Sequence, residues 1–73
     1  AGGSEKEALD MQLVSKFVPK FKSVSSENDI FALEELIEKI RKLFESKFKC
    51  SEEELDNLQV VVQLKSIIDM LGE

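Results

Sequence analysis

The sequence predicts an all-α protein, a small three-helix bundle with antiparallel neighbouring helices. Three apolar patterns at helical spacing fill most of the 73 residues, and helix-terminus signals separate them. We expect helices near residues 5–18, 29–48 and 52–71. We interpret residues 1–4 as a tag or linker remnant and residues 5–73 as one helical bundle domain. The hydrophobic fraction of 42% is enough for one packed core.

The first predicted helix, residues 5–18, has apolar side chains on one face. The row with a four-residue repeat consists of Leu9, Leu13 and Phe17. Ser4 and Glu7 have the spacing of a capping box at its start. Pro19 has no backbone N–H and disfavours helical geometry in the residue before it, so we expect the helix to end at Val18. The alternative is a kinked extra turn, because Phe21 continues the row of Leu13 and Phe17.

The second predicted helix, residues 29–48, has the most regular pattern in the chain. Its apolar stripe consists of Ile30, Leu33, Ile37, Ile40 and Phe44. Glu35 precedes Lys39 by four residues, and Glu38 precedes Lys42 in the same way, which is the favourable order for ion pairs on an exposed face. The stripe is too short for a coiled coil and is typical of a bundle helix.

The third predicted helix, residues 52–71, begins with a capping box at Ser51 and Glu54 and ends before Gly72. The short connection at residues 49 and 50 predicts a hairpin with the second helix. The apolar residues of this helix cover about two-thirds of its circumference, whereas an ordinary surface helix has a stripe only a little over ~100° wide. This excess predicts a second packing surface.

The excess apolar surface suggests where a partner binds. A first helix that ends at Pro19 is too short to cover a whole flank of the third helix. We therefore expect Val60 and Ile67 to be partly exposed in the monomer and covered by another chain. Phe31 points away from the apolar stripe of its own helix, either onto the preceding connection or outward as an anchor for a partner. The predicted partner-binding residues are Val60, Leu64, Ile67, Leu71 and Phe31.

The composition offers little for catalysis. The chain has no histidine and one cysteine, Cys50, so the commonest base for a serine or cysteine nucleophile is missing and a zinc site lacks ligands. We predict no enzymatic activity, no catalytic residues, no metal site and no cofactor. Cys50 is interpreted as a small apolar residue at a helix junction, with a reactive thiol as the alternative.

The net charge of −5 argues against a nucleic-acid binder, whose affinity comes from neutralising phosphates. No apolar run approaches the length of a membrane span. The alternation of lysine and phenylalanine over residues 15–22 admits a membrane-surface helix, although core phenylalanines with lysines at the rim explain it better. We predict an intracellular protein, with a protein partner or self-association.

Three segments resemble parts of two known families. Residues 29–44 and 62–71 resemble the second and last helices of acyl carrier proteins, which implies a helical carrier of an acyl group. That family has a serine after the aspartate to carry its phosphopantetheine arm, where this chain has Ile30, and a much longer first loop. Residues 51–59 resemble the second helix of L27 scaffold domains, which pair with one another, but Val60 and its neighbours depart from that pattern.

These observations favour a non-enzymatic protein–protein interaction or oligomerisation domain that uses apolar helix faces. The alternative is a carrier or binder of a small apolar or acyl ligand between the helices, similar to an acyl carrier protein without the phosphopantetheine serine. A helical DNA reader is a third class, which the acidic charge disfavours.

Overall fold

A computed structural model of the protein describes residues 2–24 and 26–72 and confirms the all-α fold class. Within this described part the chain forms four α-helices, one short 3-10 turn and no strand. The helices are α1 (Gly2–Val24), α2 (Ile30–Phe48), α3 (Glu52–Asp56) and α4 (Gln59–Leu71), and the 3-10 turn, η1, is Glu27–Asp29.

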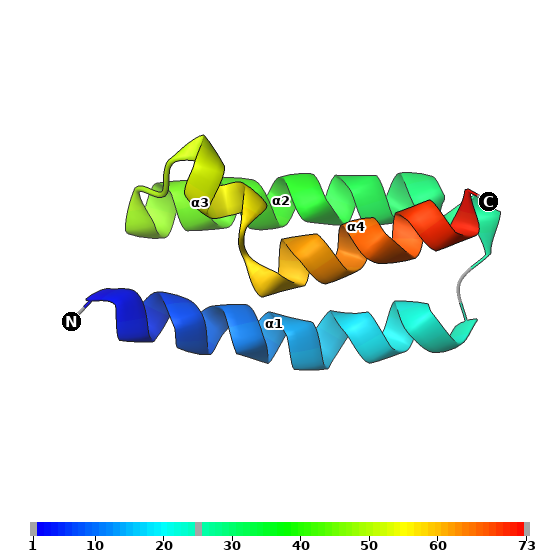
Figure 1. The fold of residues 1–73 in the computed structure, drawn as a ribbon, viewed down its shortest axis with the longest axis horizontal. Coiled ribbons are helices and arrows are strands. Elements are labelled where there is room, and N and C mark those ends of the chain that lie inside the picture. Colours follow the sequence, from blue (N-terminus) through cyan, green and yellow to red (C-terminus); the bar gives the residue numbers. More distant parts are fainter. Residues whose placement is uncertain (1, 25, 73) are drawn as a thin grey trace.

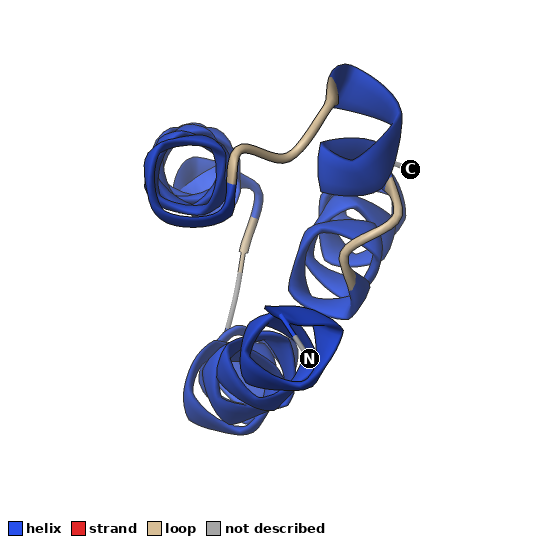
Figure 2. Ribbon diagram, turned by 90° about the vertical axis from the view of Figure 1, so that its left-hand side faces the viewer, coloured by secondary structure: helices blue, strands red, loops and turns tan. Residues whose placement is uncertain are grey.

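The three long helices lie roughly along one axis, so the molecule is elongated, with extents of 39 × 20 × 15 Å. α1 and α4 run in the same direction, and α2, which lies between them in the sequence, runs in the opposite direction (Figure 1). Seen nearly end on, α1, α2 and the α3–α4 segment occupy the corners of a triangle (Figure 2). α4 packs extensively against both α1 and α2, whereas α1 and α2 contact each other little.

α1 extends through Pro19 to Val24, so the prediction that this helix ends at Val18 is wrong. Pro19 is exposed, on the side of α1 opposite the core, where water can hydrate the carbonyl that loses its partner. The extra turn also places Phe21 against the core. Burial of this ring compensates for the missing backbone hydrogen bond. The helix begins at Gly2, and the side chain of Ser4, with its predicted capping box, lies outside the described residues.

α2 confirms the predicted second helix within one residue at its start. Before it, the Asp29 carboxylate accepts a hydrogen bond from the backbone N–H of Ser26 at 2.9 Å. At its end Lys49 adopts a left-handed conformation, with φ of 57° and ψ of 39°, and its N–H donates to the carbonyl of Glu45. This stop turns the chain sharply and produces the predicted hairpin at residues 49 and 50.

The predicted third helix is two helices, α3 and α4, separated at Asn57 and Leu58. Leu58 is extended, with φ of −61° and ψ of 134°, which interrupts the helical backbone. Leu55 and Leu58 are both buried, on either side of the break. The sequence has no glycine or proline at this point, which is why periodicity alone predicted a continuous helix.

The core lies along α4 and is closed by the inner faces of the other helices. The fully buried large side chains of the core come from α2, α3 and α4: Leu33, Phe44, Leu55, Val60, Val61 and Leu64. The predicted stripe of α2 faces this core, because Ile37 and Ile40 are also buried. Cys50 is buried in the same cluster, at the junction between α2 and α3.

We expect Ile37→Ala to reduce the free energy of unfolding by roughly 2–5 kcal/mol, because it deletes a large aliphatic side chain from a filled core. Ile37 is 6% exposed, whereas Leu43 on the same helix is 43% exposed and provides the matched control. Urea unfolding of both variants measures the difference. An equal cost for Leu43→Ala and Ile37→Ala would contradict this placement of the core.

Candidate interaction surface

Most of the predicted partner-binding residues belong to the core. Val60 and Leu64 are 0% exposed and Ile67 is 5% exposed, so the prediction that Val60 and Ile67 are partly exposed in the monomer is wrong. Leu71 is half-buried. The physical reason is that α1 is longer than predicted and α4 packs against both α1 and α2. The excess apolar surface of α4 is therefore used within the chain.

Phe31 is the exception, because 70% of it is exposed. It lies in the first turn of α2, on the face opposite the buried side chain of Leu33. Of the two orientations that the sequence left open for Phe31, the side chain adopts the outward one. An exposed phenylalanine leaves an apolar surface in water, and its burial against a partner would contribute about 1.5–3 kcal/mol.

Three exposed carboxylates continue the same face of α2, at positions three, four and seven residues after Phe31. They belong to Glu34, Glu35 and Glu38. Among the ion pairs of the described residues, none involves these three side chains, so the predicted pairs with Lys39 and Lys42 do not form. We call Phe31, Glu34, Glu35 and Glu38 the α2 outer face. It combines one exposed aromatic ring with a row of carboxylates available to a partner.

Other exposed large apolar side chains are distributed over three helices. They are Met11 on α1, Leu43 on α2, and Val62 and Met70 on α4. Isolated apolar side chains are normal on a protein surface. Phe31 differs from them in being aromatic and in having the highest exposed fraction of the five.

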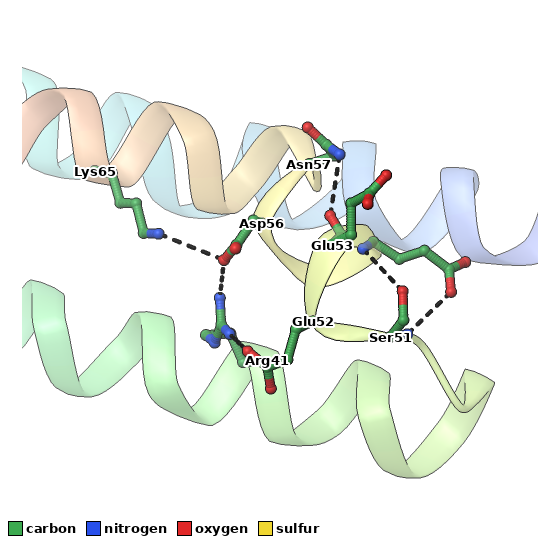
Figure 3. A network of polar contacts seen from close by, with 8 residues as sticks. Arg41, Ser51, Glu52, Glu53, Asp56, Asn57 and Lys65 are labelled. Carbon is green, nitrogen blue, oxygen red and sulfur yellow. Dashed lines mark hydrogen bonds and ion pairs between the residues drawn. The ribbon is translucent and has the colours of Figure 1, made fainter.

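The flank of α2 next to Glu38 is fixed by an ion-pair network with α3 and α4 (Figure 3). The Arg41 guanidinium donates to the carboxylates of Asp56 and Glu52, each at 2.5 Å. Lys65 of α4 lies 3.6 Å from the same Asp56 carboxylate. The hydrogen bond from Arg41 lowers the pKa of Asp56, and the bond to Asp56 raises the pKa of Arg41.

The predicted capping box at the start of α3 is confirmed. The Glu54 N–H donates to the Ser51 hydroxyl at 3.2 Å, and the Ser51 N–H donates to the Glu54 carboxylate at 2.9 Å. This backbone hydrogen bond lowers the pKa of Glu54, and Lys6 of α1, at 3.4 Å, lowers it further. α3 is thus held by its own cap and by α1.

Asp10 of α1 caps the start of α4, which the sequence reasoning missed. Its two carboxylate oxygens accept the backbone N–H groups of Gln59 and Val60, each at 2.8 Å. Leu58, the residue at the cap position, has no side-chain acceptor of its own. The sequence did contain a signal for this cap, because Asp10 lies on the apolar face of its helix, three residues before Leu13. A carboxylate in such a place needs a buried partner.

A surface pocket of about 470 Å³ lies beside this cap, between the start of α1 and the α3–α4 junction. Seven of its nine lining residues are of polar or charged type: Lys6, Glu7, Asp10, Glu53, Glu54, Asn57 and Gln59, the other two being Met11 and Leu58. The described residues contain no group of three or more metal-ligating side chains that could hold an ion. None of the described helices is long and apolar enough to span a bilayer.

Comparisons of the chain with protein-family models, with curated proteins and with solved structures each returned no significant match. They therefore assign the chain to no family and support neither of the resemblances described above.

We expect Asp10→Ala to lower the free energy of unfolding by about 1–3 kcal/mol, because it leaves the buried N–H of Val60 and the part-buried N–H of Gln59 without their acceptor. Asp10→Asn should cost less, since its amide oxygen still accepts one of them. Asp69→Ala is the matched control, because Asp69 is exposed on α4. Equal stability of Asp10→Ala and Asp69→Ala in urea unfolding would contradict the cap.

The lowered pKa values of Asp56 and Glu54 predict a pH dependence of stability. Near pH 4, where unfolded carboxyls titrate, the folded state binds fewer protons than the unfolded state, so stability rises with pH. This contribution is fully present above about pH 5 and is lost as the pH falls through the folded pKa values.

In Arg41→Gln the acid limb of the stability curve should be shallower, because Asp56 loses the group that lowers its pKa. Urea unfolding at a series of pH values measures the slope. Lys39→Gln provides the control, because Lys39 is exposed and forms none of the ion pairs of the described residues. A slope in Arg41→Gln as steep as in the wild type would exclude this origin of the acid sensitivity.

Proposed function

We propose that this chain is a non-enzymatic protein–protein interaction domain that binds its partner through the α2 outer face. The observation that carries the proposal is the 70% exposure of Phe31, the one predicted partner-binding residue whose side chain remains largely in water. Aromatic side chains are enriched among residues that dominate binding energy. Phe31 supplies the apolar anchor and the neighbouring carboxylates supply a charged rim.

The way in which α2 is held supports this proposal. Its inner face is packed in the core through Leu33 and Ile37, and one flank is held by the ion pairs of Arg41. The helix whose first turn carries Phe31 is therefore held in a fixed position. A surface that is ordered before binding loses less conformational entropy when the complex forms.

The alternative function, a carrier of a small apolar ligand, has less support. The pocket beside α3 is lined by seven charged or polar residues and only two apolar ones, and six large apolar side chains fill the centre of the bundle with less than 2% exposure. Ligand sites for apolar molecules are mostly lined by apolar side chains. We therefore place the interaction at the surface of the bundle.

The proposal is tested by placing a photo-crosslinking phenylalanine derivative at position 31 and irradiating an extract of cells that produce the protein. We expect a discrete adduct from position 31 and none from position 66 on the outer side of α4, where Ser66 is exposed. Phe31→Ser should remove the partner from a pull-down and change the free energy of unfolding by less than about 0.5 kcal/mol. Equal labelling from positions 31 and 66 would refute the proposal.

A further inference from the structure

We propose that the partner of the α2 outer face is a second copy of this chain, which docks the basic part of its α1 against the carboxylates of α2. This inference rests on the proposed function and adds the identity of the partner. Its basis is a separation of charge along the sequence, together with the match in spacing between the two charged faces.

The second half of α1 is basic in a protein whose net charge is −5. Between Met11 and Val24 the chain has three lysines and no aspartate or glutamate. Lys16 and Lys20 are exposed and, in the described part of the molecule, neither forms an ion pair. Their ammonium groups lie instead over the rings of the adjacent phenylalanines, at 5.5 and 5.9 Å from the centroids.

The two charged rows have the same spacing. Lys16 and Lys20 are four residues apart on one face of α1, and Glu34 and Glu38 are four residues apart on α2. Each pair therefore spans about 6 Å along its helix, so both lysines can meet both carboxylates when α1 of one copy lies along α2 of another. The chain thus carries the surface that is complementary to its own α2 outer face.

The aromatic anchor also finds a matching surface on α1. Phe17 and Phe21 are half-buried, so part of each ring remains in contact with solvent beside the lysines. Phe31 of the second copy would pack against these ring surfaces, and aromatic pairs are favourable beyond the area that they bury. The contact then has an apolar centre and charged flanks, as specific interfaces do.

This arrangement forms a closed dimer. If α1 of each copy packs on α2 of the other, the same pair of surfaces is used twice and a two-fold axis relates the chains. Both copies are acidic and repel each other over long distances, but salt screens this repulsion beyond a Debye length of about 10 Å at 0.1 M ionic strength. The ion pairs at the interface act at much shorter range.

The test uses two charge-reversed variants of the whole chain, K16E/K20E and E34K/E38K, in sedimentation equilibrium at concentrations up to about 1 mM. We expect the wild type to dimerise and the dissociation constant of each variant alone to rise by at least about tenfold, because four attractive contacts become repulsive. A 1:1 mixture of the two variants should form a heterodimer close to wild-type affinity, because one of its two interfaces has attractive, reversed pairs and the other regains the wild-type pairs.

The matched control for net charge is E7K/E53K, which carries the same total charge as E34K/E38K and alters two exposed carboxylates outside α2. Mixed with K16E/K20E, it should form a heterodimer clearly weaker than E34K/E38K does, because one of the two interfaces then places four carboxylates against one another. Circular dichroism establishes that each variant is folded, and the single variants K20E and E38K replace any double variant that is not.

The possible results separate this inference from the proposed function. A wild type that stays monomeric, while position 31 crosslinks to a different protein, overturns the second-copy inference and leaves the proposed function standing. Dimerisation that neither charge reversal weakens also overturns the inference. Rescue by the E7K/E53K control as complete as by E34K/E38K would show attraction by net charge alone, and it too overturns the inference.

Discussion

The hydrogen bonds that the Asp10 carboxylate accepts from the first amides of α4 are the interaction on which the arrangement of the other helices depends. The break at Leu58 lets both Leu55 and Leu58 enter the core, but it also creates a new helix start inside the molecule. Leu58 cannot cap that start, and Val60 is fully buried, so water cannot satisfy its amide. A carboxylate from a helix some fifty positions earlier satisfies it instead. The cap therefore fixes the position of α1 relative to α4, and an anion at a helix N-terminus also interacts favourably with the helix dipole.

This geometry explains why the apolar surface of α4 serves the chain itself. A helix of 13 residues with apolar side chains over most of its circumference needs neighbours on two flanks, and α1 and α2 provide them. α1 reaches far enough because its helix continues through Pro19, whose ring lies on the solvent side. The cost of one missing backbone hydrogen bond at an exposed place is smaller than the gain from packing Val18 and Phe21.

Features that depend on local chemistry could be predicted from the sequence, and features that depend on distant partners could not. The stripe of α2 and the capping box at Ser51 are properties of a few adjacent residues, and both appear in the structure. The path through Pro19 and the break at Leu58 depend on what α1 and α4 bury against each other, which helical periodicity does not contain. Of the candidate site, only Phe31 is largely exposed. The narrow, regular stripe of α2 indicated that its side chain points away from the core, but the sequence left open whether the ring packs on the preceding connection or faces solvent. The broad pattern of α4 gave no such direction, so its residues were assigned to a partner.

The outer faces of α1 and α2 differ in charge, because exposed lysines lie on α1 and exposed carboxylates lie on α2. In the part of the molecule that the structure describes, no ion pair involves the carboxylates of the α2 outer face, whereas Arg41, beside Glu38 on the same helix, is engaged by Asp56 and Glu52. The one arginine of the chain is therefore used for internal structure, and the flexible lysines of α1 remain for the surface. An interface built from such exposed lysines and carboxylates gains little energy from each pair. The aromatic anchor must supply most of the affinity, and the charges decide which surface it meets.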